Sequence, residues 1–259
     1  LLILIGLALI GFGIYRAMRR RMFFEAPDFS FGILPFALLI VTVGVLLVLE
    51  PHMSGLIIIT AIIAIIMTVG GCSWRYIVGA LGVGGIGMFG LLNLLPHSKG
   101  RLDVWKDPFS NIREGGWQPA QSLYAIGNGG LWGVGIGQSR QKHLYLPEPM
   151  NDYIFAILCE EFGFVGAMVL LALYLGLIYQ SFRIAQGASS LFGSLIVMCV
   201  VGMWLFQILE NIGMDCGLMP ITGIPLPFVS YGSSFMLVNF VMLGLIGSVW
   251  SHSAGVGKK

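Results

Sequence analysis

The chain has 259 residues, of which 57% are hydrophobic and 10% are charged, with a formal net charge of +2. A soluble domain of this length needs many more polar residues to cover its surface, so the composition excludes a water-soluble globular protein. The small net charge does not indicate a nucleic-acid partner. The four cysteines show no metal-ligand spacing and are interpreted as packing residues: Cys72, Cys159, Cys199 and Cys216.

Seven apolar segments predict an all-α fold, a polytopic transmembrane helix bundle that forms a single membrane domain over residues 1–259. They lie at residues 1–17, 33–49, 56–69, 77–95, 153–179, 191–209 and 231–250. About 20 helical residues cross a hydrocarbon core of about 30 Å, so the third segment is short for a span. The chain opens at Leu1 inside an apolar run, and we expect its natural N-terminus to lie further upstream.

Basic residues predict the orientation. The arginines of residues 16–21 and the lysines of residues 258–259 fall on one side of the membrane if the seven spans alternate. The short connections on the other side, near residues 50–55 and 211–228, contain no Lys or Arg. By the positive-inside rule the C-terminus is cytoplasmic, and residues 96–152 form a large extracytoplasmic loop.

This loop is expected to be ordered, because it contains Trp105, Trp117 and Trp132 beside the glycine-rich run at 127–137. A short interfacial helix is predicted at residues 121–127. The basic side chains of the long loop either contact lipid headgroups or form a site for an anionic group such as a diphosphate. These side chains are Arg101, Lys106, Arg113, Arg140 and Lys142.

Asp152 is the leading candidate for chemistry, because it stands where the loop becomes an apolar helix. A carboxylate between water and hydrocarbon is unfavourable unless it is used or paired. Glu50 and Glu210 reach a similar depth from two other helices, and converging carboxylates can activate a hydroxyl or hold a divalent cation. The alternatives are structural: Asp152 as an N-cap or first-turn acid, and Glu210 as an interfacial cap.

Two further patterns accompany Asp152. Glu160 and Glu161, about two turns deeper in the same helix, are expected to face the bundle or a polar cavity rather than lipid. Residues 219–234 hold three prolines in eight positions and cannot form a regular helix. We expect a rigid re-entrant or surface segment there, followed by a capped helix start at residues 230–234.

Five separated blocks occur in a recognisable order along the chain. They are Trp105-Lys106-Asp107-Pro108, then Gln118 with Gln121-Ser122-Leu123 through Gly135, then Gln141-Lys142 with Leu146-Pro147-Glu148 and Asp152-Tyr153-Ile154-Phe155-Ala156, then Asn211-Ile212-Gly213-Met214, and Gly223-Ile224-Pro225-Leu226-Pro227-Phe228 with Ser230-Tyr231-Gly232. In this order the blocks resemble the SEDS family of FtsW, RodA and SpoVE. The resemblance covers essentially the whole chain. Family members have ten spans, so it implies that these seven are the fourth to the tenth.

The resemblance implies a peptidoglycan glycosyltransferase that polymerises lipid II. The acceptor's sugar hydroxyl attacks the donor's anomeric carbon, and undecaprenyl diphosphate leaves. The family's catalytic aspartate matches Asp152, the predicted general base. Lys142 and Arg140 are candidates to offset charge on the leaving diphosphate, and Trp132 with the glycine run to shape a lipid-sugar groove. The other predicted substrate contacts are Arg101, Gln121, Ser122 and Glu210.

The resemblance also implies a class B penicillin-binding protein, a transpeptidase, as partner in the bacterial cell membrane. A divalent cation, Mg²⁺ or Mn²⁺, is compatible with the carboxylates, but the sequence specifies no ligand set. Two alternatives stay open. A lipid II flippase needs a polar path, for which Glu160, Glu161 and few other polar residues are present. A non-catalytic scaffold for the transpeptidase needs neither path nor base. A role in division, elongation or sporulation is not distinguished.

Overall fold

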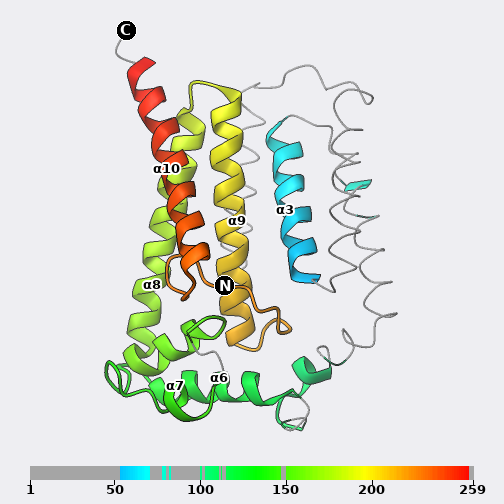
Figure 1. The fold of residues 1–259 in the computed structure, drawn as a ribbon, viewed down its shortest axis with the longest axis vertical. Helices are drawn as coiled ribbons and strands as arrows, with labels where there is room; N and C mark the ends of the chain where they lie inside the picture. Colours follow the sequence, from blue (N-terminus) through cyan, green and yellow to red (C-terminus); the bar gives the residue numbers. More distant parts are fainter. Residues whose placement is uncertain are drawn as a thin grey trace. The chain divides into compact units, whose positions relative to one another are not determined.

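The computed structural model describes residues 53–70, 78–79, 82, 100, 103–110, 112, 115–146 and 150–256. Within these ranges the regular structure is helical and no strand occurs, which confirms the predicted all-α class. The helices are α3 (Met53–Val69), α6 (Trp117–Gly129), α7 (Arg140–Leu144), α8 (Ile154–Gly187), α9 (Leu191–Asp215) and α10 (Ser233–Val256) (Figure 1).

Three described helices are long and apolar enough to cross a membrane, over Ile154–Gly187, Leu191–Asp215 and Ser233–Ser253. They coincide with the predicted spans at 153–179, 191–209 and 231–250. The span expected at 56–69 falls in α3, whose 17 residues make about 25 Å of helix. The spans expected at 1–17 and 33–49 lie outside the described residues, and only residues 78, 79 and 82 of the span at 77–95 are described.

The chain divides into two compact units. The first contains α3, α8 from Ile178, α9 up to Phe206 and α10 from Val241. The second contains α6, α7, α8 up to Leu177, the end of α9 from Gln207 and the start of α10 up to Phe240. Asp152 and most of the other described polar side chains singled out by the sequence belong to this second unit.

Helix α8 is interrupted at Gly163, which has φ 68° and ψ −168°. Two N–H groups beyond the break donate to the glycine-rich loop, and two N–H groups of the loop donate back to α8 carbonyls. The four bonds are Phe164 N to Gly130 O (2.9 Å), Val165 N to Leu131 O (3.1 Å), Val134 N to Glu160 O (2.9 Å) and Gly135 N to Glu161 O (3.1 Å). The glycine-rich run is therefore a backbone partner of α8, which explains its composition.

Only residues without a Cβ allow this approach. An ideal Cβ on Gly133 would overlap the carbonyl of Glu161, and one on Gly163 would overlap the backbone N of Gly133 and the carbonyl of Leu131. Both glycines also have positive φ, which L side chains rarely adopt. The glycines at these two positions are required by the backbone contact.

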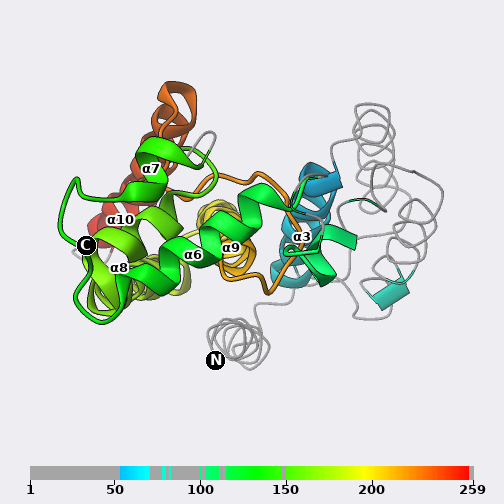
Figure 2. The same cartoon turned by 90° about the horizontal axis from the view of Figure 1, so that it is seen from below.

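Helix α6 runs across the ends of α8 and α9, below them in Figure 1 and in front of them in the view from below (Figure 2). The prediction of a helix at 121–127 was right in kind and short at both ends, because α6 runs from Trp117 to Gly129. Pro119 stands in the first turn, where its missing N–H has no helical partner to lose. That position makes the early start compatible with proline.

Candidate active site around Asp152

Asp152 is half-buried in a turn that leads into α8. The helix begins at Ile154, and the carbonyl of Tyr153 accepts the first helical bond from Ile157 N at 3.3 Å. Tyr153 therefore occupies the N-cap position, and Asp152 precedes it by one residue. Asp152 is therefore neither the N-cap nor a first-turn residue of α8, the two structural roles that the sequence left open, although a negative charge here still interacts favourably with the helix N-terminus.

The end of α9 contacts this turn through two polar side chains. Asp215 accepts a hydrogen bond from Ala156 N at 2.9 Å, and Asn211, one turn earlier, donates to the carbonyl of Asp152 at 2.7 Å. Both side chains are fully buried, and Asp215 interacts electrostatically with Asp152. Sequence reasoning did not single out Asp215. Its only signal was an acidic residue within the apolar stretch that follows α9's core.

The irregular chain between α9 and α10, here called the proline-containing segment, also lies beside Asp152. Gly223 has φ 69°, and an ideal Cβ there would lie 3.3 Å from Asp152 Oδ2. Glycine therefore leaves room for the carboxylate. The segment is irregular between α9 and α10, as its prolines predicted, and α10 starts at Ser233.

Glu210 does not lie just past the end of its helix, as the sequence suggested, because α9 continues to Asp215. In this extension of the helix, the Asn211 amide donates to the carbonyl of Asp152 and the Asp215 carboxylate accepts from Ala156 N. Glu210 is buried and is hydrogen-bonded by the hydroxyl of Thr222 in the proline-containing segment. Glu50 and Arg101, also singled out by the sequence, lie outside the described residues.

The two basic candidates lie on α7, a five-residue helix capped by Ser139, whose hydroxyl accepts from Lys142 N at 3.0 Å. The Ser139 hydroxyl also donates to Glu160, which accepts from Gln141 N at 3.3 Å as well. Lys142 Nζ lies 4.0 Å from Glu161 Oε1. Glu160 and Glu161 are both buried, which confirms that they face protein rather than lipid. Arg140 is exposed.

The remaining predicted contacts differ in accessibility. Gln121 and Ser122 are buried in α6, and the Ser122 hydroxyl donates to the carbonyl of Asp215 at 2.9 Å. Trp132, in the glycine-rich loop, has 79% of its surface exposed. Hydrogen bonds therefore link Ser122 to Asp215, and Asp215 to the first turn of α8, while Trp132 faces outward. A substrate-binding role for these side chains stays a prediction.

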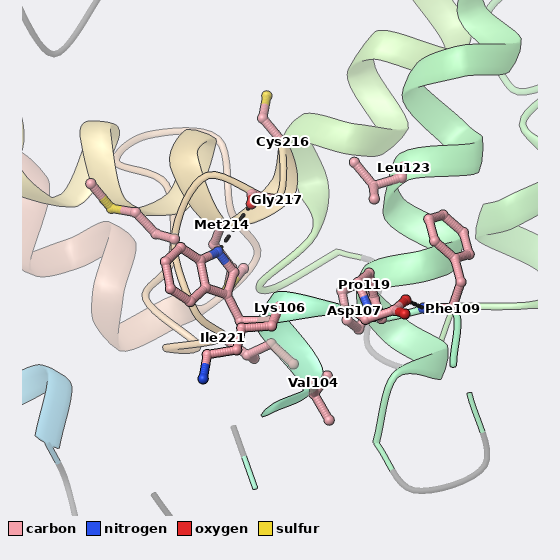
Figure 3. Close-up of a pocket in the computed structure, with 13 residues that line it drawn as sticks. Val104, Lys106, Asp107, Phe109, Pro119, Leu123, Met214, Cys216, Gly217 and Ile221 are labelled. Atoms are coloured by element: carbon pink, nitrogen blue, oxygen red, sulfur yellow. Dashed lines mark hydrogen bonds between the residues drawn. The ribbon is translucent and has the colours of Figure 1, made fainter. Parts of the chain in front are cut away.

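A cavity of about 310 Å³ lies next to this region (Figure 3). Its lining is mainly apolar and includes Met214 and Ile221, which also belong to the cluster packed around Tyr153. The Trp105 indole donates to Gly217 O, just after the end of α9, at 3.0 Å. This bond is drawn as a dashed line in Figure 3. Asp152 is not among the lining residues.

Cys216 also lines the cavity. Burial, followed by the charge of Asp215, raises the pKa of its thiol to about 11. The thiol is therefore neutral at physiological pH and behaves as a packing group. Among the described residues, no cluster of three or more His, Cys, Asp or Glu side chains is arranged to hold a metal ion.

Comparison with known proteins identifies the family. The model of the family FtsW/RodA/SpoVE, described as cell cycle protein, matches residues 10–255. The chain is 37% identical to stage V sporulation protein E of Bacillus subtilis, over 87% of this chain and 62% of that protein. It is 34% identical to the probable peptidoglycan glycosyltransferase FtsW of Nitrosomonas europaea, over 83% of this chain and 56% of that protein. The chain thus spans about three fifths of these relatives' length.

A solved structure agrees in fold. A chain of the structure described as "Structural coordination of polymerization and crosslinking by a peptidoglycan synthase complex" superposes with a TM-score of 0.69 at 27% identity, covering 93% of this chain and 67% of that one. The apolar helices and these relatives support a multi-pass membrane protein. The resemblance seen in the sequence blocks is confirmed, and the chain belongs to the FtsW/RodA/SpoVE family.

Proposed function

We propose that the protein is a peptidoglycan glycosyltransferase that polymerises lipid II, with Asp152 as general base. The observation that carries this proposal is the setting of Asp152: a half-buried carboxylate at the start of α8, beside a glycine that leaves it room. A positioned carboxylate of this kind suits proton abstraction from a hydroxyl. The name of the Nitrosomonas europaea relative supports the same reaction class.

In the proposed step the acceptor's sugar hydroxyl gives its proton to the Asp152 carboxylate. Its oxygen forms a bond to the anomeric carbon of the donor, and the bond from that carbon to the diphosphate oxygen breaks. The electron pair leaves with undecaprenyl diphosphate. A general base of this kind contributes about 10²- to 10⁴-fold to the rate.

Lys142 and Arg140 are proposed to stabilise the leaving diphosphate. The 4.0 Å separation between Lys142 Nζ and Glu161 Oε1 is a loose ion pair that leaves the ammonium able to bind a second anion. Arg140, two residues before Lys142 in α7, is exposed. Its guanidinium can bind two phosphate oxygens. The pairing of Glu160 and Glu161 with α7 argues against a polar path through these residues, on which the flippase alternative depended.

The other substrate contacts are proposed with different emphasis. The exposed Trp132 indole suits stacking on a sugar or contact with a lipid chain. Three of the predicted contacts are buried, and we propose that they mainly support the structure of the site: Gln121, Ser122 and Glu210. Arg101 keeps its predicted role as a charge for the substrate. The reaction is proposed to take place on the extracytoplasmic face, with residues 96–152 outside the membrane and the C-terminus cytoplasmic.

A class B penicillin-binding protein is the proposed partner. The neighbour structure is described as a peptidoglycan synthase complex that coordinates polymerization and crosslinking, which supports a transpeptidase beside this fold. The partner would crosslink the strands that this protein makes.

The test is glycan polymerisation from lipid II by purified protein in detergent, with the product separated on gels. Asp152→Asn is expected to lower the rate by at least about 10²-fold while expression and melting stay unchanged. Asp103→Asn, an exposed carboxylate with no assigned role, is the matched control and is expected to keep full activity. Activity retained in Asp152→Asn rejects the base. Translocation without polymer would favour a flippase, and stimulation of the transpeptidase without polymer would favour a scaffold.

A further inference from the structure

The turn that carries Asp152 is held by its backbone. Three consecutive carbonyl groups each accept a hydrogen bond from a distant part of the chain. The pairs are Tyr231 N to Met150 O (2.8 Å), Ser230 Oγ to Asn151 O (2.6 Å) and Asn211 Nδ2 to Asp152 O (2.7 Å). None of these three bonds uses the Asp152 carboxylate, so they orient the residue without occupying its reactive group.

Asn211 connects two walls of the site. Its amide nitrogen donates to Asp152 O and also to Ile224 O, at 2.7 and 2.8 Å. Ile224 follows Gly223, the residue that faces the Asp152 carboxylate. One side-chain amide therefore sets the spacing between the carboxylate and its glycine neighbour. Asn211 is fully buried, so water cannot replace these two bonds if the amide is removed.

Ser230 makes an equivalent connection from the other end of the proline-containing segment. Its hydroxyl donates to Asn151 O at 2.6 Å and accepts from Leu226 N at 2.7 Å. Ser230 is also fully buried. The hydroxyl thus joins the residue before Asp152 to the backbone just beyond Ile224.

These contacts fix the position of the Asp152 backbone. A reacting group must lie within about 0.5 Å of its productive position, and a 1 Å error can reduce the rate by about 10²-fold. The Asp152 turn precedes α8, so it lies outside the regular hydrogen-bond ladder of that helix. Three external donors, two of them side chains on rigid or proline-restricted elements, can provide the required precision.

We propose that Asn211 and Ser230 are positioning residues that hold the Asp152 turn in its reactive geometry. We call this set of bonds the carbonyl clasp, defined by Asn211, Ser230 and the backbone N–H of Tyr231. The inference rests on the proposed glycosyltransferase function. It assigns to the fourth and fifth sequence blocks, in which these residues occur, a role in orienting the base.

The test measures kcat and KM for lipid II polymerisation by the purified protein. Asn211→Leu is expected to lower kcat by about 10- to 100-fold, with KM changed by less than about threefold. Asn239→Leu is the matched control: Asn239 is also fully buried, but its amide donates to Phe235 O within α10 at 2.9 Å. Both substitutions replace a fully buried amide with an apolar side chain of similar size. Only Asn211→Leu removes a donor from the carbonyl of Asp152, so only this variant should lower kcat.

Ser230 provides a second pair of variants, which decides the matter if Asn211→Leu does not fold. Ser230→Ala removes the hydroxyl and is expected to lower kcat about tenfold or more, while Ser230→Thr keeps the hydroxyl and should retain most activity. A kcat within twofold of wild type in either Asn211→Leu or Ser230→Ala overturns the carbonyl clasp.

Backbone amide exchange, followed by mass spectrometry, separates this inference from the proposed function. If wild-type protein makes no polymer, the glycosyltransferase proposal fails. The clasp is then judged by exchange at residues 150–156. Faster exchange in Asn211→Leu and Ser230→Ala than in Asn239→Leu supports it, and unchanged exchange rejects it.

Discussion

The carboxylate of Asp215, at the last position of α9, accepts a hydrogen bond from the backbone N–H of Ala156 in the first turn of α8. The N-cap position of α8 is occupied by Tyr153, which lacks the short acceptor side chain that caps helices well. A residue 59 positions away supplies the acceptor instead. This contact ties the start of α8, and so the turn with Asp152, to the end of α9.

We expect Asp215→Ala to destabilise the protein by about 1–2 kcal/mol, because it leaves a buried first-turn N–H without an acceptor. Asp215→Asn keeps an acceptor oxygen and should lose less. Thermal melting of the two variants in the same detergent measures the difference. Equal melting temperatures for wild type and Asp215→Ala would show that the bond does not stabilise α8.

Gly223→Ala should impair activity more than stability. The substitution strains a residue at φ 69° by about 1–2 kcal/mol and brings a methyl group to 3.3 Å from Asp152 Oδ2. Gly217→Ala is the matched control, since φ there is 71° and the nearest contact of a Cβ is Leu123 at 3.6 Å. Similar melting but a lower kcat in Gly223→Ala is the expected result. Equal kcat in the two variants would contradict crowding of the carboxylate.

Gly133→Ala and Gly163→Ala should each prevent correct folding or lower stability by more than about 2 kcal/mol. A Cβ at either position overlaps the backbone of the other segment and meets a positive φ. Gly176→Ala, further along α8, has no atom within 4 Å of its Cβ and should match or exceed wild-type stability. Yield of monodisperse protein and its melting temperature test all three variants. A normally stable Gly163→Ala would contradict the backbone pairing with the loop.

Cys216 should react slowly with alkylating reagents at neutral pH. Because its thiol pKa is raised to about 11, mainly by burial and then by Asp215, about one molecule in a thousand carries the thiolate at pH 8. The rate should rise about tenfold per pH unit up to that pKa. Site-resolved mass spectrometry of alkylated peptides measures it. A rate that levels off near pH 8.5, the behaviour of an ordinary cysteine, would contradict this environment.

Local patterns predicted the long helices and the irregular segments well. The apolar runs at 153–179, 191–209 and 231–250 form α8, α9 and α10. A span in hydrocarbon must satisfy its backbone N–H and C=O groups internally, and a helix does so. Helix ends were less accurate: α9 runs on to Asp215 because Asn211 and Asp215 find partners that the linear pattern does not reveal. The place of Asp152 at a helix start was also readable from sequence.

The sequence predicted that the glycine-rich loop is ordered, but it did not predict which part of the chain the loop contacts. Its glycines are required by the break in α8 at Gly163, some thirty residues later. The predicted grouping of basic and acidic residues was likewise open until α7 was seen to pair Lys142 with Glu161.

Sequence alone determined that this is a helical membrane protein of the FtsW/RodA/SpoVE family with a carboxylate at the mouth of a span, since hydropathy, charge and motif order are local properties. Only the tertiary structure decided how that carboxylate is held. The bonds from Asn211 to Asp152, from Ser230 to Asn151 and from Ala156 to Asp215 join residues 59, 79 and 59 positions apart. Hydrogen bonds at such separations depend on how α8, α9 and the proline-containing segment pack, and no local pattern encodes that packing.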